Sequence, residues 1–512
     1  THNLPPSTVS KVIMKIQEFL EHHGIEGNPF AEEDAQNDTV FKRTCLESTF
    51  HPGWDKIYGS PEDPSTSIVF GEKGAGKTAL KLQMVRQFER HNDTSRGPDA
   101  NKKPSFVVIY DDFNPFLDRF VSRSGRNRPV EKSLGHWKLW DHMDAILSLA
   151  VTQLVSAIIH RSKTEPVGDG KNHSWSAPHA RDLTLLAALY DQSTAETFPS
   201  RWRKLRWRVG YGSIFGRWPT FLGLVSTALF VAALVTSIPT KNLDWLSLWW
   251  PWLLLAGTWV PWLWRRCQCW WKAFRIVRSM RTGNRTVGQL VKALSKMREA
   301  DLAGQPLPII ARSDDRYELF AKLQGVLQAV GYGGMIVIID RLDEPHVING
   351  SAERMKQIIW PIFDNKFLKS PGLGFKMLLP NELYRFIERE DESFNQRARL
   401  DKQNLIPSLE WSGETLYDIA SMRLKAASVK EPPTTLAELF EPEVNQSRLI
   451  DGLRSVRVPR QLFKFLYRLL VAHCHAHTAE NPSYKIPLER FDTELAVFRR
   501  DQDAFDRGLA PR

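Results

Sequence analysis

The residues with the clearest chemistry lie at positions 71–78, where the sequence reads Gly-Glu-Lys-Gly-Ala-Gly-Lys-Thr. This segment fits the phosphate-loop pattern G-x-x-x-x-G-K-[ST], in which glycines let successive backbone N–H groups point into one concavity. A helix that begins near Lys77 adds the partial positive charge of its first turn. Lys77 is expected to reach the β- and γ-phosphates of a nucleotide, and the Thr78 hydroxyl to ligate Mg²⁺. The residues expected to contact the nucleotide are Gly71, Glu72, Lys73, Gly74, Ala75, Gly76, Lys77, Thr78 and Ala79.

An acidic motif follows the fully apolar segment 335–339, which predicts a buried strand. Asp340 stands at the carboxyl end of that strand, the place of a Walker B carboxylate that holds Mg²⁺. A carboxylate just past this ligand is placed to polarise an attacking water. Most P-loop ATPases of this sort carry an acidic residue directly after the Asp, whereas this chain has Arg341. The base is therefore predicted to be Asp343 or Glu344, and the sequence does not choose between them.

Other polar residues follow a further predicted strand at 375–379. Asn381 is placed to sense the γ-phosphate, with an ordinary helix cap as an equally weighted alternative. Arg397 and Arg399 have the charge of an arginine finger for a neighbouring nucleotide, but a solvated basic loop is the favoured interpretation. The segment 473–477 contains three histidines and a cysteine, yet it has no second cluster, so metal binding is not expected there.

The elements that must position these residues are four apolar segments that alternate with segments of helical period. This alternation predicts an α/β fold with a mainly parallel sheet and flanking helices, with Asp340 beside the glycine-rich loop. The predicted divisions are an N-terminal helix with its lead-in segment, a first part of the nucleotide-binding core, a membrane insertion, a second part of the core and a helical C-terminal domain. Their bounds are 1–60, 61–200, 201–290, 291–425 and 426–512.

Two long uncharged segments separate the two parts of the predicted core. Residues 218–240 and 245–264 are each long enough to cross a hydrocarbon layer as a helix. Twelve of the 18 tryptophans fall between 202 and 271, as expected for aromatic anchoring at membrane interfaces. Six Lys or Arg residues lie within 201–217 and seven within 265–285, so the positive-inside rule puts both flanks in the cytoplasm. A pair of buried core helices is the alternative.

The distribution of charge limits the partners that the chain is expected to bind. The formal net charge is +11, yet residues 201–300 alone carry +15 and the remaining residues carry −4. This imbalance argues against a general nucleic-acid surface. Four cysteines in 512 residues give no disulfide framework, which fits a reducing compartment. The segment 9–20 is amphipathic and contains Lys and Glu, so no signal peptide is expected.

Taken together, these motifs resemble the KAP-type P-loop NTPases, a branch of the STAND class within the AAA-like ATPases. The resemblance rests on a two-span hairpin inserted between the loop at 71–78 and the strand that ends at Asp340. It rests also on Asp340-Arg341-Leu342-Asp343-Glu344, which is similar to the Asp-x-Leu-Asp signature of that family. The family commonly ends the signature with Arg, where this chain has Glu344.

The resemblance implies an ATPase that binds ATP and Mg²⁺. The catalytic residues would be Lys77 with Asp343 or Glu344, and the metal ligands Thr78 and Asp340. The helix after Pro459 would be a lid in which Arg460 acts as a second sensor. The resemblance further implies two spans in the inner (cytoplasmic) membrane with both terminal parts cytoplasmic, and a homo-oligomer with operon-encoded partner proteins. Related bacterial members occur in phage-exclusion and other defence operons, so a role in antiviral defence or signalling is implied.

Three functions fit these motifs. The favoured one is a membrane-anchored ATPase switch, in which nucleotide binding and hydrolysis reorder the C-terminal domain and the inserted hairpin. A membrane-anchored DNA translocase would need a basic channel outside residues 201–300, where the charge balance is −4, so nucleic acid is not expected to bind directly. A membrane scaffold with a structural nucleotide is the third, and the sequence speaks against it because it retains Lys77, Thr78, Asp340 and Glu344. The sequence lacks an Asn-Lys-x-Asp guanine signature, which favours ATP over GTP.

Overall fold

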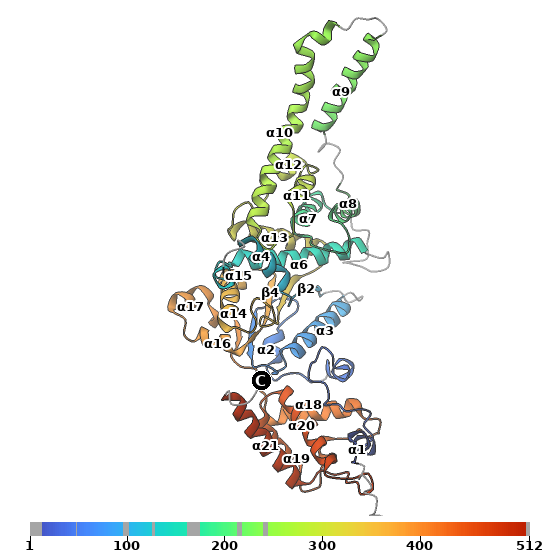
Figure 1. The fold of residues 1–512 in the computed structure, drawn as a ribbon, viewed down its shortest axis with the longest axis vertical. Helices are drawn as coiled ribbons and strands as arrows, with labels where there is room; N and C mark the ends of the chain where they lie inside the picture. Colours follow the sequence, from blue (N-terminus) through green and yellow to red (C-terminus); the bar gives the residue numbers. More distant parts are fainter. Residues whose placement is uncertain are drawn as a thin grey trace, which may run out of the picture.

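The computed structural model describes residues 13–47, 49–95, 102–124, 129–160, 175–211, 218–238 and 244–507. A five-stranded, all-parallel sheet lies near the middle of this elongated molecule (Figure 1). A pair of helices projects from one end, and a helical C-terminal domain forms the other (Figure 1). The prediction of an α/β fold with a parallel sheet and flanking helices is confirmed.

The sheet combines strands from both parts of the sequence. Its order is β2-β3-β4-β1-β5. The strands are β1 (Ser67–Gly71), β2 (Ser105–Tyr110), β3 (Gly334–Ile339), β4 (Leu373–Pro380) and β5 (Asn404–Ile406). Every residue of β1, β3 and β4 is buried, as their apolar sequences predict for a parallel sheet covered on both faces. Gly71 is paired with Pro380 and Tyr110 with Ile339, so the carboxyl ends of these four strands meet at one edge.

Helices cover both faces of the sheet. These helices, together with those that pack against them, are α2 (Trp54–Tyr58), α3 (Lys77–Ser95), α4 (Asn114–Ser124), α5 (Val130–Leu134), α6 (Leu139–His160), α7 (Ala177–Tyr190), α8 (Phe198–Val209), α11 (Val287–Leu294), α12 (Glu299–Leu302), α13 (Asp314–Ala329), α14 (Ala352–Ile359), α15 (Asn365–Leu368), α16 (Asn381–Ile387) and α17 (Glu392–Ala398). Alternate residues of β1 face opposite sides. Val69 packs in one core with Leu80 and Phe88 of α3, and Ile68 belongs to a larger core that contains α6, α7 and α13.

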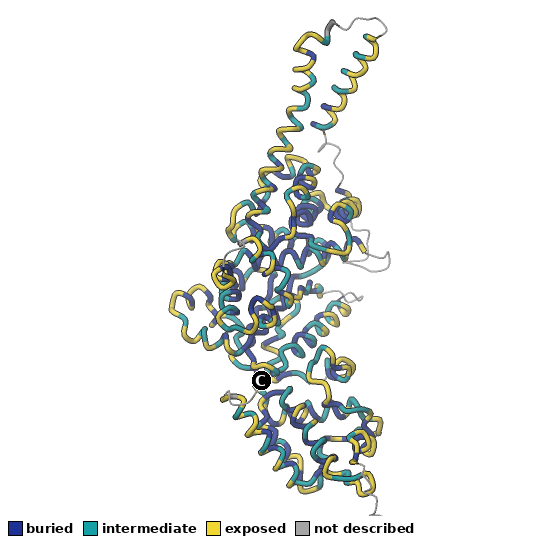
Figure 2. Tube along the Cα trace, viewed as in Figure 1, coloured by how far each residue is buried: buried dark blue, intermediate teal, exposed yellow. Residues whose placement is uncertain are grey.

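The projecting hairpin consists of α9 (Trp218–Ser237) and α10 (Trp249–Ser279). Most of its outer surface is exposed, in contrast to the buried helices around the sheet (Figure 2). The exposed apolar side chains include Phe221, Leu224, Leu229, Val231, Val235, Trp249, Leu253, Leu254, Val260, Leu263 and Trp264. Polar contacts join the two helices, with Ser226 Oγ 2.6 Å from Thr258 Oγ1, and Trp259 Nε1 donating to Thr227 Oγ1 at 3.1 Å.

Two helices among the described residues are long and apolar enough to cross a membrane, α6 and α9. Their surroundings differ, because 72% of the apolar window of α6 is buried in the core and only 6% of that of α9. α9 covers most of the first predicted span. The second predicted span, 245–264, lies largely in α10. This helix is long enough to cross a membrane, but it is not among the apolar ones because it is rich in tryptophan, which hydropathy scales rank near neutral. Residues 239–243 lie outside the described residues.

A buried ion pair fixes the end of α10 to the helices on the sheet. Arg316 of α13 makes two 3.1 Å hydrogen bonds to the Asp144 carboxylate of α6, and both side chains are fully buried. The same guanidinium donates to Ser279 Oγ of α10 at 3.0 Å, and Tyr190 of α7 donates to Asp144 at 2.8 Å. Since buried charges are costly unless they are paired, this cluster locks four helices into one arrangement.

The C-terminal domain has its own hydrophobic core. It contains α18 (Gly413–Ala427), α19 (Gln446–Leu453), α20 (Pro459–His475) and α21 (Leu488–Asp506). The N-terminal helix α1 (Ile16–His22) packs into the same core through Phe19 and Leu20. His473 is buried there, and its Nε2 lies 2.9 Å from the Ser483 carbonyl oxygen. The described residues contain no group of three or more His, Cys, Asp or Glu side chains arranged for a metal.

The buried Lys376 of β4 predicts a pH-dependent stability. Its Nζ lies 3.4 Å from Ser65 Oγ, and burial lowers the pKa of Lys376 from its ordinary value to about 7. The unfolded chain holds this proton up to about pH 10, so the free energy of unfolding should rise from about pH 7 to about pH 10. Lys376→Met should remove this rise and stabilise the protein at pH 7, as measured by urea unfolding in detergent. The exposed Lys464→Met is the control, and an identical slope in both variants would contradict the prediction.

Candidate functional site

The glycine-rich loop turns sharply between β1 and α3. Gly74 and Gly76 have φ angles of 92° and 91°, a conformation that only glycine adopts easily. Ala75 N donates to Glu72 O at 3.1 Å, and Leu80 N donates to Gly76 O at 2.9 Å, where α3 begins. Lys77 Nζ bends back over the loop and donates to Gly71 O at 2.6 Å and to Glu72 O at 3.0 Å. The first turn of a 19-residue helix thus faces the concave side of the loop.

Asp340 follows β3 directly and lies deep at the edge of the sheet. Only 2% of the residue is exposed. Its Oδ2 atom is buried and has no hydrogen-bond partner among the described residues, although Lys81 Nζ lies 3.1 Å away. Arg341 has a φ angle of 57°, which turns the chain away from the edge immediately after Asp340. A buried carboxylate oxygen with unused lone pairs, on the same edge as the Thr78 hydroxyl, fits Mg²⁺, which takes few protein ligands and completes its shell with water and phosphate.

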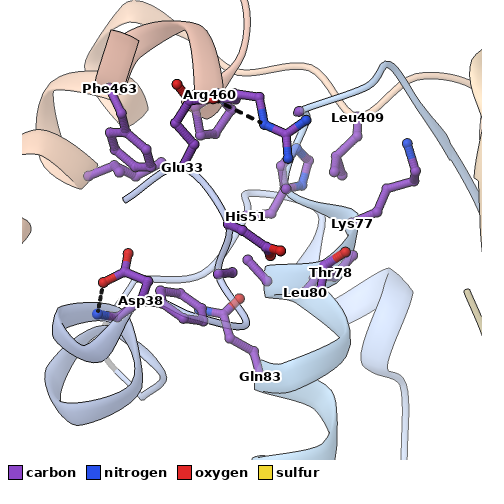
Figure 3. A pocket seen from close by; sticks show the side chains of 18 of the residues that line it. Glu33, Asp38, His51, Lys77, Thr78, Leu80, Gln83, Leu409, Arg460 and Phe463 are labelled. Carbon is purple, nitrogen blue, oxygen red and sulfur yellow. Dashed lines mark hydrogen bonds and ion pairs between the residues drawn. The ribbon is translucent and has the colours of Figure 1, made fainter. Parts of the chain in front are cut away.

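These features open into one cavity, which lies between the sheet edge, α3 and the C-terminal domain (Figure 3). The sequence-predicted residues that line it are Lys73, Gly74, Gly76, Lys77, Thr78, Ala79, Asp340, Asp343, Glu344 and Arg460. Figure 3 shows Lys77 and Thr78 on α3 on one side and Arg460 on α20 on the other. The predicted residues that do not line it are Gly71, Glu72, Ala75 and Asn381. The structure therefore gathers residues from positions 73 to 460 around a single space.

The remaining wall comes from segments that the sequence did not single out for this place. The N-terminal contributors are Glu33, Asp34, Ala35, Asp38, Phe41, Cys45, Thr49 and His51, and the C-terminal ones include Trp411, Ile419, Met422 and Phe463. Much of this wall is apolar and aromatic. Three aromatic residues of the segment before β1, Phe30, Phe50 and Trp54, are not in the lining, and Phe50 packs on Trp54 with ring centroids 4.4 Å apart.

The C-terminal domain is bonded directly to the loop. Arg460 N donates to Gly74 O at 3.3 Å, and Trp411 Nε1 donates to Ala75 O at 2.9 Å. The Arg460 Nε atom is buried without a hydrogen-bond partner among the described residues and lies 3.9 Å from the Glu33 carboxylate. An unsatisfied guanidinium N–H beside a glycine-rich loop is available to an anionic ligand.

The charges around the cavity oppose one another. Burial lowers the pKa of Lys77, while the carboxylates of Asp343, Asp340 and Glu382 act in the opposite direction. Burial also raises the pKa of Glu344, helped by the neighbouring aspartates and opposed by Arg341, whose Nε lies 3.4 Å from Glu344 Oε1. A carboxylate with a raised pKa is suited to accept a proton near neutral pH.

Asn381, Arg397 and Arg399 lie outside the lining of this cavity. Asn381 is the first residue of α16, and the N-cap position belongs to Pro380, so the capping alternative does not apply. Since β4 lies between β1 and β3, Asn381 follows a strand end on the same edge as Asp340. Arg397 lies over the Phe394 ring at 5.6 Å, and Arg399 caps α17 with a φ angle of 46°. Neither arginine lines the cavity.

No protein-family model, curated protein or solved structure matches this chain. The interpretation of the site therefore rests on its geometry and on the chemistry of its residues.

Gly74 should be intolerant of a side chain. A Cβ atom at this position would lie 2.7 Å from the Cβ of Arg460, and its φ angle is already unfavourable for other residues. Gly74→Ala should reduce the free energy of unfolding by about 2–4 kcal/mol, from backbone strain together with the clash. Gly27→Ala is the matched control, because its φ is 77° with no atom within 4 Å, and it should lose only about 1–2 kcal/mol. Equal losses in urea unfolding would contradict the close contact between the loop and α20.

Proposed function

We propose that this protein is a membrane-anchored, Mg²⁺-dependent ATPase of the KAP type, acting as a nucleotide-driven switch. The observation that carries the proposal is the convergence of Lys77, Thr78, Asp340 and Arg460 on one cavity from elements far apart in the sequence. Positive φ at Gly74 and Gly76, at the first turn of α3, supports phosphate binding by the loop. The apolar remainder of the cavity offers a place for the base of the nucleotide.

In the proposed reaction, water attacks the γ-phosphorus of ATP. The bond between the γ-phosphorus and the β–γ bridging oxygen breaks, and ADP and inorganic phosphate leave. Lys77 turns from the Gly71 and Glu72 carbonyl oxygens to the phosphate oxygens, where its charge offsets the negative charge of the transition state. Thr78 and Asp340 would hold Mg²⁺, which supplies further charge neutralisation when bound. Arg460 contacts the phosphates from the lid and so links their presence to the position of α20.

Glu344 is the proposed general base. Its raised pKa favours proton transfer from the attacking water, whereas Asp343 is the acidic group that most strongly favours the charged form of Lys77. Glu344 is thus proposed to accept the proton, and Asp343 to stabilise the charged form of Lys77.

Turnover of ATP by the detergent-purified protein tests this assignment. Glu344→Gln should lower kcat by about 10²–10⁴-fold and leave ATP affinity within a few-fold of the wild type. Asp343→Asn should weaken binding and turnover together, because Lys77 loses its neighbouring charge. Full turnover by Glu344→Gln with loss in Asp343→Asn would transfer the base role to Asp343. Wild-type protein that binds ATP and never hydrolyses it would favour a scaffold with a structural nucleotide.

The hairpin is proposed to lie in the inner membrane. The 20 residues of α9 extend about 30 Å, the thickness of a hydrocarbon core. Below the apolar part of α10, cations pair with aromatic rings, with Arg266 5.3 Å from the Trp262 ring and Arg275 4.8 Å from the Trp271 ring. Such a mixture of Trp and Arg suits the headgroup region of a bilayer. Association of several copies, together with operon-encoded partners in antiviral defence, completes the proposal.

A topology reporter distinguishes this arrangement from a soluble one. A reporter inserted within 241–244 should be found outside the cytoplasm, because the flanks on both sides are rich in Lys and Arg. The same reporter inserted at Asn481, in a loop of the C-terminal domain, should remain inside. A cytoplasmic signal from both positions would rule out a hairpin that spans the membrane.

A further inference from the structure

A second lysine of α3 lies at the carboxylate proposed to hold the metal. Lys81 is one helical turn after Lys77, so both side chains leave the same face of the helix. Its Nζ donates to Asp111 Oδ2 at 3.0 Å and lies 3.1 Å from Asp340 Oδ2. The exposed fractions of the side chains are 4% for Lys81 and 3% for Asp340, against 32% for Asp111. The ammonium group is thus held between two carboxylates in a nearly dry place.

The sheet creates this arrangement. β2 and β3 are neighbours in parallel register, with Tyr110 opposite Ile339, and the next residue of each strand is an aspartate. Asp111 and Asp340 therefore leave the same edge side by side, with Asp340 N directed at the Tyr110 carbonyl oxygen. Two adjacent carboxylates, here the buried Asp340 and the partly exposed Asp111, repel each other unless a cation lies between them. In this structure the cation is Lys81.

The two contacts of Lys81 differ in kind. The contact with Asp111 is a hydrogen bond, whereas the contact with Asp340 Oδ2 is close but not aligned as one. Asp340 is neutralised by the nearby charge while the lone pairs of Oδ2 stay unused. Lys81 therefore supplies the charge that a metal would supply without occupying the coordination position of the oxygen.

We propose that Lys81 is an internal counter-ion that keeps the metal site from binding free divalent cations until a nucleotide is present. This inference rests on the proposed role of Asp340 as a metal ligand. A positive charge 3.1 Å from Asp340 repels a second cation, and the negative charge of a triphosphate reverses that balance. Mg²⁺ then binds together with the nucleotide and not before it. Lys81 is a positioning residue, because it contacts the carboxylates and not the reacting phosphate.

Binding of Mn²⁺ alone, measured from the electron paramagnetic resonance signal of the free ion, tests the proposal without any turnover. Lys81→Met should bind Mn²⁺ in the absence of nucleotide at least about ten-fold more tightly than the wild type. The reason is that the negative charges of Asp111 and Asp340 are then no longer compensated by Lys81. Lys81→Arg keeps the positive charge and should bind as weakly as the wild type. Unchanged or weaker binding by Lys81→Met would overturn the proposal, because Lys81 would then orient Asp340 instead of opposing the cation.

The same comparison in an Asp111→Asn background guards against misfolding of the single variant. Asparagine at this position relieves the repulsion between the two carboxylates that Lys81→Met would otherwise leave unpaired. The double variant should bind Mn²⁺ more tightly than Asp111→Asn alone, and equal affinities would overturn the proposal.

Asp340→Asn separates this inference from the proposed function on which it rests. If this variant binds Mn²⁺ with ATP as well as the wild type does, the metal role of Asp340 itself fails. If binding of Mn²⁺ with ATP depends on Asp340 while Lys81→Met leaves the affinity for free Mn²⁺ unchanged, only the counter-ion role of Lys81 fails.

Discussion

The sheet order, in which β4 pairs with both β1 and β3, determines where the two polar motifs of the chain meet. It brings the loop after Gly71 and the carboxylate after Ile339 to one edge, although β2 and the whole insertion between β2 and β3 separate them in the sequence. The chain between Tyr110 and Gly334 must leave the sheet and return to an adjacent strand. Any element in that insertion is therefore attached at both ends to the strands that form the proposed nucleotide site.

The hairpin is such an element, and α10 gives it a stiff connection. This helix continues for 31 residues through Pro261 to Ser279, where it meets the buried Arg316–Asp144 pair. Just beyond it, Arg281 Nε donates to the buried Asp141 of α6 at 3.0 Å. Because α6 packs on β2, a shift at the sheet edge has a continuous path of packed elements to the projecting helices. The C-terminal domain provides a second path, through the hydrogen bonds of Arg460 and Trp411 to the loop.

The parts that could be predicted from the sequence are those encoded by contiguous residues. The strands β1, before the loop, and β3, before Asp340, are apolar segments with clear ends. Gly74 and Gly76 mark a turn with positive φ angles that other residues rarely adopt. The cavity wall from Glu33 to His51 was not predicted in detail, because its place depends on packing between the two ends of the chain. Lys81 and Asp111 were also missed as a pair. The i, i+4 spacing from Lys77 and the aspartate after β2 were visible signals, but the register of β2 against β3 was not.

The proposed nucleotide would occupy the cavity between the glycine-rich loop and α20 and contact both. Amide hydrogen exchange followed by mass spectrometry, with and without Mg²⁺ and ATP, would detect these contacts. If ATP binds there, exchange should slow in both residues 71–80 and residues 457–463 of the wild type, and in neither segment of Lys77→Ala. Exchange that stays unchanged at the loop, or that slows equally in Lys77→Ala, would contradict the proposal.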